Sequence, residues 1–284
     1  MGEERRIWLV NNAESGSNTA EALEECIAHL GRCGISVAHR TVFPAQELPT
    51  PALLDCAGIE TVAVFAGDGT VNALLGALRD WSGAILILPG GTMNLLYHRL
   101  FGDADWPDVV DAVGCGQAFR HRPAVIEAPC GIAYAGLLAG PGTAWGDVRE
   151  AMRDGSLIEM ASGAREAFAQ TLSGPRLACS DPDLGRREGY PLILLTPEGG
   201  AMVVDAYHAE TTGEYLEQLT ALARREFRDG PHDRLGETQA VTLASVEGGG
   251  FGVLVDGEEC PVDSATRFEL AECPVDLLAT RRDG

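Results

Sequence analysis

The stretch TVAVFAGDGTVNALLGALRDWSGAILILPGGTMN, residues 61–94, decides the fold that we expect for this chain. It contains two apolar runs, at 61–66 and 84–88, and each run is followed by a glycine-rich segment and then by a helix-like pattern. Short apolar runs bounded by glycine are typical of strands that are buried on both faces. Two such strand–loop–helix units in succession predict a parallel sheet with helical crossovers, which is an α/β domain.

The same alternation continues on both sides of this stretch. We expect further strands at 7–10 and 35–42, and helices at 19–33, 53–57, 71–78, 94–100 and 108–114. After about His121 the pattern changes to strands in hairpin-like succession, with a helical insert at 214–227. We expect these strands at 118–127, 131–138, 192–196, 202–207, 239–246, 251–255 and 267–270. The sequence therefore predicts an α/β domain at residues 1–121 and a mostly antiparallel β domain at residues 122–272.

Glycine-rich loops follow three predicted strands of the α/β domain, at residues 11–17, 66–72 and 88–94. Because the carboxyl ends of parallel strands meet at one edge of a sheet, we expect the loops to converge there. Glycine lets a backbone approach a ligand closely, and the next helix offers N–H groups at its N-terminus, so such an edge binds phosphate without lysine. One loop alone would indicate only a helix-capping turn, whereas three predict a phosphate-binding edge.

Three side chains in these loops carry chemistry. Thr70 and Thr92 are suited to cap the following helices or to bind phosphate oxygens. Asp68 would repel a phosphate unless a divalent cation lay between them or the carboxylate handled a substrate proton. The loops therefore predict a site for a phosphorylated ligand with a cation or a proton-transfer step.

The charge balance excludes several functions. The chain has 284 residues, 45% of them hydrophobic, and its 21 basic residues, all arginine, face 42 acidic ones, for a net charge of −21. Without lysine there is no lysine-bearing P-loop and no Schiff-base lysine. Such an acidic chain is not expected to bind nucleic acid or to dock on an anionic membrane by charge. A small basic cluster, Arg120-His121-Arg122, either faces phosphate or is a solvated hinge at the predicted domain junction.

The eight cysteines form no CxxC pair, and we expect no histidine at metal-ligand spacing from them. The apolar run at 7–10 is too short for a signal-peptide core or a membrane span. We therefore expect reduced, mostly buried thiols in a cytoplasmic protein.

The motifs resemble those of a known family. Residues 67–72, GDGTVN, resemble the GGDGT-x-N-E motif of diacylglycerol kinases, sphingosine kinases and bacterial lipid kinases, a superfamily that includes NAD kinases. Residues 88–94, LPGGTMN, resemble the family's LPxGTxND loop, and residues 12–16 its N-P-x-S-G loop. Residues 255–258, VDGE, resemble the late D-G-E motif. The first two motifs, about twenty residues apart, are specific as a pair.

The resemblance implies an α/β domain followed by a β-sandwich domain, an active site in the cleft between them, and a tail at 273–284 that returns to the first domain. It implies transfer of the ATP γ-phosphate to a lipid hydroxyl with Mg²⁺, and it ties Asp68 and Glu258 to catalysis, with Asp68 also reaching the metal through the nucleotide. The implied nucleotide-binding residues are Asn12, Ser15, Gly16, Thr41, Gly67, Asp68, Gly69, Thr70, Asn72, Gly91, Thr92 and Asn94.

The sequence departs from the family pattern at four loop positions, which hold Ala13, Ala66, Ala73 and Leu95. Ala73 and Leu95 stand where the family has a glutamate and an aspartate. The segment that supplies an accessory magnesium site in the family corresponds at best to residues 198–202, EGGAM, which counts against that site.

These departures leave alternatives open. We expect a lipid kinase, but a nucleotide-binding regulatory protein without catalysis and a NAD kinase-like enzyme with a soluble substrate are both compatible with the loops. A lipid substrate would have to be reached by apolar contact, from a less charged bilayer or from a carrier, so membrane contact would be transient. A homodimer is left open by the sequence.

Overall fold

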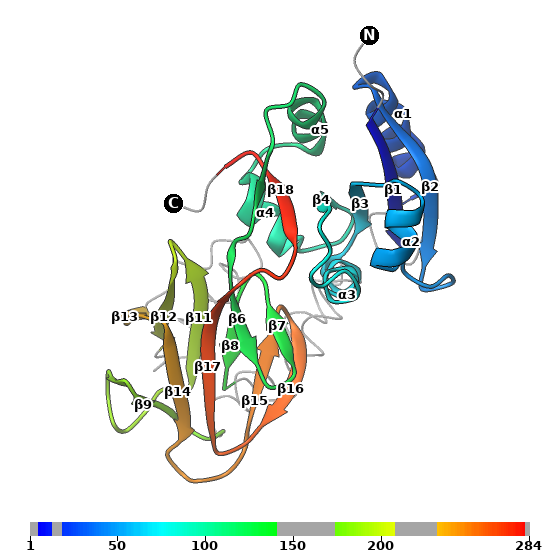
Figure 1. The fold of residues 1–284 in the computed structure, drawn as a ribbon. Helices are drawn as coiled ribbons and strands as arrows, with labels where there is room; N and C mark the ends of the chain where they lie inside the picture. The colour runs from blue at the N-terminus through cyan, green and yellow to red at the C-terminus, as the bar shows by residue number, and fades with distance from the viewer. Residues whose placement is uncertain (1–4, 13–18, 141–173, 208–231, 282–284) are drawn as a thin grey trace. The chain divides into compact units, whose positions relative to one another are not determined.

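The computed structural model describes residues 5–12, 19–140, 174–207 and 232–281 (Figure 1). Its contacts divide the chain into two units. Unit 1 comprises residues 1–123 and 272–284, and unit 2 comprises residues 124–271. The helix expected at 214–227 lies outside the described residues.

Unit 1 contains one six-stranded sheet in the order β2-β1-β3-β4-β18-β5. Its strands are β1 (Arg5–Asn12), β2 (Ile35–Phe43), β3 (Thr61–Ala66), β4 (Ala84–Pro89), β5 (Phe119–His121) and β18 (Asp276–Ala279). All neighbours are parallel except β5, which runs antiparallel to β18 at the edge. The central strands β3 and β4 are buried along almost their whole length, as their continuous apolar runs predict.

The helices of unit 1 are α1 (Ala20–Arg32), α2 (Pro51–Cys56), α3 (Asp68–Ala77), α4 (Leu95–Phe101) and α5 (Trp106–Gly114). The side chains of Thr19 and Thr50 accept N–H groups from the first turns of α1 and α2, so both helices begin at a threonine N-cap. Helix α3 begins three residues before the expected start, because Gly67 is already its extended N-cap. Asp68 is therefore the first residue of a helix.

Unit 2 contains two antiparallel sheets, in the orders β10-β9-β14-β17-β6-β7 and β13-β12-β11-β8-β15-β16. The strands are β6 (Ala124–Ala128), β7 (Gly131–Ala133), β8 (Leu137–Ala139), β9 (Leu177–Asp181), β10 (Asp183–Leu184), β11 (Leu192–Glu198), β12 (Ala201–Tyr207), β13 (His232–Thr238), β14 (Ala240–Ser245), β15 (Phe251–Val255), β16 (Glu258–Val262) and β17 (Ala265–Glu272). Buried residues of both sheets, such as Val241 and Phe268 from one and Ile193 and Val253 from the other, share one core. The predicted combination of an α/β domain with an antiparallel β-sandwich is confirmed.

Two expected strands are each divided. The run at 118–127 becomes β5 in unit 1 and β6 in unit 2, with Pro123 between them. The run at 131–138 becomes β7 and β8, which belong to different sheets. Residues 134–136 leave the strand conformation because their N–H groups donate to the carboxylate of Asp256.

The basic cluster Arg120-His121-Arg122 lies next to the boundary of unit 1, and its two arginines pair with one carboxylate. Arg122 Nε lies 2.7 Å and Arg120 Nη1 3.3 Å from the carboxylate of Asp276 on β18. Arg120 also donates to the carbonyl oxygen of Ser82. Partial burial alone would raise the pKa of Asp276. The hydrogen bonds and charges of the two arginines outweigh this effect and lower the pKa. The cluster therefore holds β18 in the sheet.

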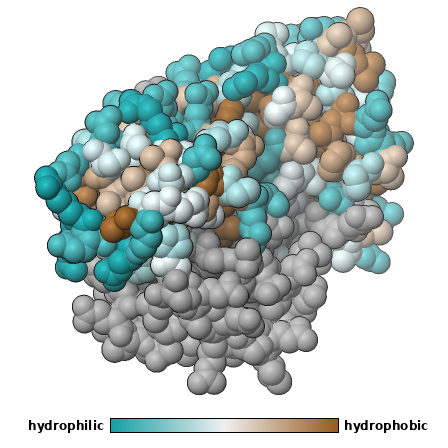
Figure 2. Space-filling view, turned by 90° about the horizontal axis from the view of Figure 1, so that it is seen from below, coloured by the Kyte–Doolittle hydropathy of each residue, from teal (hydrophilic) through white to brown (hydrophobic). Residues whose placement is uncertain are grey.

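Few of the large hydrophobic side chains that the structure describes are exposed. Among the described residues, the exposed large hydrophobic side chains are those of Leu53 and Val246. On the face drawn in Figure 2, hydrophobic residues are interspersed with hydrophilic ones. Within the described residues, no helix is both long enough and apolar enough to span a membrane.

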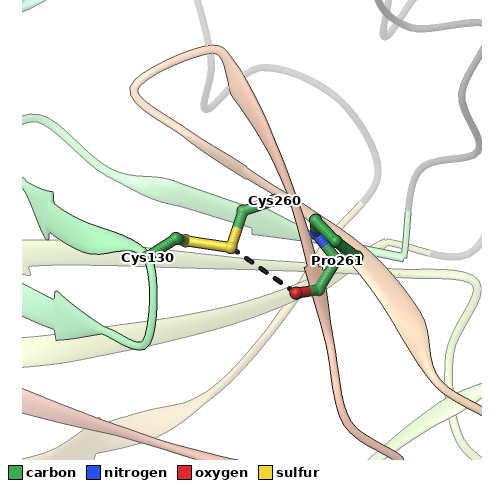
Figure 3. The surroundings of a disulfide bond; sticks show 3 residues. All are labelled: Cys130, Cys260 and Pro261. Atoms are coloured by element: carbon green, nitrogen blue, oxygen red, sulfur yellow. Dashed lines mark hydrogen bonds between the residues drawn. A yellow bond between two sulfur atoms is a disulfide. The ribbon is translucent and has the colours of Figure 1, made fainter.

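The expectation that all cysteines are reduced is wrong. Cys130 and Cys260 form a disulfide in unit 2 (Figure 3). Cys130 lies in the turn between β6 and β7, and Cys260 lies on β16, so the bond joins the outermost strands of the two sheets. The two cysteines are 130 residues apart in sequence, and only the tertiary pairing of these edges brings them together.

The remaining six cysteines are free thiols, and three of them, Cys26, Cys179 and Cys273, are buried as expected. Burial is the largest cause that raises the pKa of Cys26 to about 12 and those of Cys179 and Cys273 to about 11. These three thiols therefore stay protonated and unreactive at neutral pH.

The expectation that no histidine lies at metal-ligand spacing from a cysteine is also wrong. His29 and Cys33 are four residues apart at the end of α1, a spacing that places both side chains on one helix face. Both contact the carboxylate of Asp111 on α5.

Candidate active site

The two central glycine loops lie side by side at the carboxyl ends of β3 and β4. Ala66 and Pro89 are partners in the register of these strands, and the Gly90 N–H donates to the Ala66 carbonyl at 3.1 Å. A Cβ atom at Gly90 would lie 2.6 Å from the Ala66 backbone nitrogen, and one at Gly91 would lie 2.5 Å from Gly67 Cα. Glycine is required at both positions because the loops pack backbone against backbone.

Asp68 joins the first loop to the second. Its Oδ1 accepts the Leu95 N–H at 2.8 Å, so the carboxylate from the start of α3 lies at the N-terminus of α4. Burial is the largest influence and raises the pKa of Asp68, while N–H groups of Leu95, Asn94, Asp68 itself and Leu96 act in the opposite direction. A carboxylate that accepts backbone N–H groups fixes the relative position of the two loops.

Asn94 closes the second loop on itself. Its Oδ1 accepts the Gly91 N–H at 2.9 Å, and its Nδ2 donates to the Gly91 carbonyl at 2.8 Å. Asn94 is buried and has a positive φ of 51°, in the left-handed region that asparagine tolerates well. The described contacts of its side chain therefore shape the loop.

The third predicted loop meets the first through a side-chain contact. Asn12, the last residue of β1, donates from Nδ2 to Thr70 Oγ1 at 3.0 Å. The hydroxyl of Thr41 on β2 accepts the indole N–H of Trp8 at 2.9 Å and is buried within the sheet. Ser15 and Gly16 lie outside the described residues.

The surface of this edge is formed by residues of both loops. Gly69 and Thr92 are exposed, whereas Gly67 and Asn72 are half-buried. The hydrogen bonds of the α3 ladder begin with the N–H groups of Thr70 and Val71, which donate to the Gly67 carbonyl, so Gly69 precedes the ladder at the positive end of a ten-residue helix. Backbone N–H groups, threonine hydroxyls and one carboxylate form a donor set that fits a nucleotide phosphate and its magnesium ion.

Glu258, the second predicted catalytic residue, lies in unit 2. It is exposed and begins β16, directly after the two-residue turn Asp256-Gly257 of the β15–β16 hairpin. Both turn residues have positive φ, 47° and 89°, as a tight hairpin turn requires. Glu258 thus belongs to unit 2, whereas Asp68 belongs to unit 1.

Sequence reasoning missed the function of Asp256. Its carboxylate accepts the N–H groups of Tyr134, Ala135 and Gly136 at 2.7, 2.8 and 3.0 Å, and its own N–H donates to the Gly136 carbonyl. These bonds anchor the turn that presents Glu258. The Asp-Gly pair signals the hairpin, but no local signal shows that the segment 134–136, about 120 residues away, supplies the N–H groups.

The segment that corresponds to the family's accessory magnesium site forms a hairpin turn between β11 and β12. Gly199 and Gly200 adopt positive φ angles of 58° and 80°. Among the described residues, no group of three metal-ligating side chains includes this turn.

Comparisons with known proteins agree with this arrangement. Residues 6–122 match the family model of the diacylglycerol kinase catalytic domain. Two solved structures from Bacillus anthracis str. Sterne, described as a diacylglycerol kinase and a putative diacylglycerol kinase, are similar with TM-scores of 0.63 and 0.64. Each is 13% identical in sequence, and the similarity covers 98% of this chain and 98% of the other. No curated protein matches the chain. Residues 6–122 therefore belong to the diacylglycerol kinase catalytic domain family, which confirms the resemblance found in the glycine loops.

Proposed function

We propose that this chain is an ATP-dependent kinase that transfers the γ-phosphoryl group to the hydroxyl of a lipid or lipid-like alcohol. The observation that carries the proposal is the joined pair of loops at the ends of β3 and β4, in which Asp68 reaches from the start of α3 to the Leu95 N–H. The family match over residues 6–122 supports the reaction class. Phosphoryl transfer depends mainly on positioning and charge neutralisation, and two rigidly connected loops suit that task.

The proposal assigns roles to several groups of the loops. The N–H groups at the start of α3 and the hydroxyl of Thr92 bind the phosphates, because the chain has no lysine for that purpose. Asp68 would hold Mg²⁺ through the nucleotide, and the ion neutralises phosphate charge when it is bound. The backbone contacts of Asp68 keep its carboxylate in place. Asn12 and Thr70 hold the end of β1 against the start of α3.

Glu258 is the group that we assign to the acceptor hydroxyl as general base. It is an exposed carboxylate on a hairpin whose turn is anchored by Asp256. Glu259, its neighbour on the same strand, is also exposed and provides a matched comparison.

The acceptor is proposed to be a lipid because the matched domain is that of diacylglycerol kinases. A net charge of −21 opposes electrostatic docking on an anionic bilayer. The substrate is therefore expected to come from a weakly charged bilayer or from a carrier, with transient contact. Transfer of label from ATP should accordingly be faster to a lipid in neutral mixed micelles than to the same lipid in anionic vesicles.

The proposal is tested by incubating the full chain with γ-labelled ATP, Mg²⁺ and a total lipid extract, and by following the label into the organic phase. Label in a lipid product that is absent without the protein is expected. Label that enters only water-soluble products, such as a phosphorylated dinucleotide, would contradict the lipid acceptor and favour a soluble substrate.

A second candidate is a nucleotide-binding regulatory protein without catalysis. Ala73 and Leu95 favour it, because they stand where the family has charged residues near the nucleotide. Such a protein would be stabilised thermally by ATP. It would give no labelled product from any fraction of the extract.

A further inference from the structure

Two helix ends in unit 1 present metal-ligating side chains toward each other. His29 and Cys33 lie four residues apart at the end of α1, and Asp111 and Cys115 lie four residues apart at the end of α5. Cys33 and Cys115 are the C-cap residues of the two helices. A four-residue spacing places each pair on one helix face. The same pattern therefore occurs twice, once on each of two neighbouring helices.

Three of these side chains are already in contact. His29 Nε2 lies 2.7 Å from Asp111 Oδ1, and Cys33 Sγ lies 3.0 Å from the same oxygen. The three ligand atoms all lie within 4.8 Å of one another. A tetrahedral zinc ion with bonds of about 2.0–2.3 Å holds its ligand atoms about 3.3–3.7 Å apart. Shifts of the ligand atoms of less than about 1 Å would thus turn the hydrogen-bonded triad into a coordination shell.

Cys115 is available as the fourth ligand. It is exposed one helical turn from Asp111. A Cβ at Gly114 would lie 2.8 Å from Cys33 Cβ, so the two helix ends pack in direct contact.

We propose that His29, Cys33, Asp111 and Cys115 form a zinc site that ties α1 to α5. An imidazole, two thiolates and a carboxylate are all ligand types that zinc accepts. Both helices end at the site, and the negative ends of their dipoles favour a cation. On binding, the two thiols lose their protons to solvent, and the metal replaces the hydrogen bonds to Asp111.

Arg32 competes with the metal in this arrangement. Its guanidinium lies 2.8 Å from His29 Nδ1, and because arginine is always a donor, Nδ1 accepts and Nε2 carries the proton toward Asp111. Coordination through Nε2 moves the ring proton to Nδ1, so Arg32 must turn away. Replacing Arg32 should therefore tighten metal binding.

The site is separate from the glycine loops. Arg5, the first residue of β1, donates from its side chain to the Val113 carbonyl in the last turn of α5. The end of α5 therefore lies near the amino end of β1, whereas the glycine loops follow the carboxyl ends of β3 and β4. The zinc site is expected to stabilise unit 1 without taking part in phosphate binding.

The test is a titration of the full chain with Co²⁺ and then Zn²⁺ in metal-free buffer with a non-coordinating reductant. One equivalent of Co²⁺ should produce thiolate-to-metal absorption in the near ultraviolet and visible bands typical of tetrahedral cobalt, and Zn²⁺ should abolish both. Cys33→Ser and Cys115→Ser should each weaken binding at least about tenfold. Cys56→Ser, at an exposed cysteine on α2, should leave binding unchanged.

Arg32→Ala should strengthen Co²⁺ binding, a change that a site elsewhere in the chain would not show. If a cysteine variant fails to fold, Asp111→Asn keeps the side-chain shape and should weaken binding in the same way. Absence of the thiolate absorption in the wild type, or equal binding by the wild type and Cys33→Ser, would overturn the proposal. Unchanged absorption in Cys115→Ser would overturn the four-ligand site.

Discussion

Asp68 and Asp256 each fix a loop by accepting backbone N–H groups. Asp68 joins the starts of α3 and α4 through Leu95, and Asp256 joins the β15–β16 turn to residues 134–136. Buried carboxylates are costly unless such donors compensate them, and hydrogen bonds to charged groups are among the stronger ones in proteins. Asp68 is itself a predicted catalytic residue. Asp256 anchors the turn that precedes the other one, Glu258.

Asp256→Asn should destabilise unit 2 by about 1–3 kcal/mol, because an amide cannot accept at both of its polar atoms and leaves backbone N–H groups unpaired. Urea unfolding followed by circular dichroism measures the change. Asp263→Asn, at an exposed aspartate of the same unit, is the control. Equal stability of both variants would show that the Asp256 carboxylate contributes no net stabilisation.

Strand β18 is held in its sheet partly by side-chain charge. It lies between β4 and β5, and Asp276 at its start contacts Arg120 and Arg122 of the segment around β5. The strand has only four residues, so its backbone hydrogen bonds with its neighbours are few. The arginine–aspartate cluster therefore contributes to holding the end of the chain in the sheet.

This cluster makes stability depend on pH. Because the pKa of Asp276 is lowered in the folded chain, its contribution is present above its ordinary value of about 4 and is lost as the pH falls through the folded-state pKa. Asp276→Asn should cost about 1 kcal/mol at pH 6, since the partners are partly exposed. The difference from the wild type should shrink below about pH 4. Thermal unfolding at a series of pH values measures it, and a difference that does not change with pH would contradict the assignment.

Sequence patterns predicted the elements of unit 1 better than those of unit 2. Continuous apolar runs mark β3 and β4, and each helix of unit 1 overlaps an expected one. No strand was expected at β9, β10, β13, β16 or β18. Strand β10 has only two residues, and β16 begins with two exposed glutamates, so neither shows a clear apolar pattern. Likewise, the glycine-rich loops predicted where the site lies. Its hydrogen bonds, such as the one from the Leu95 N–H to Asp68, could not be predicted, because they arise from the packing of one loop on the next.

The whole molecule combines a lysine-free, acidic chain with a disulfide that joins two sheet edges. Phosphate binding in such a chain depends on backbone N–H groups and hydroxyls, which the loops of unit 1 present. Cys130 and Cys260 close a long loop in unit 2. A cross-link of this kind stabilises mainly by restricting the unfolded chain.

Reduction of the disulfide should therefore lower the stability of unit 2 by about 2–5 kcal/mol. Calorimetry with and without reductant measures the change, and Cys130→Ser with Cys260→Ser should behave like the reduced protein. Thiol counting in denaturant should give six free thiols before reduction and eight after it. Eight thiols before reduction would contradict the disulfide.

The kinase assignment is tested most directly by the rate of phosphoryl transfer in charge-neutralising variants of the two predicted catalytic carboxylates. Asp68→Asn and Glu258→Gln should each lower the rate of label transfer to lipid by about 100-fold or more. Asp103→Asn and Glu259→Gln, at exposed carboxylates of the same two units, should keep it within a few-fold of the wild type. Wild-type rates in Asp68→Asn or Glu258→Gln, with ATP still stabilising the protein thermally, would contradict the assignment.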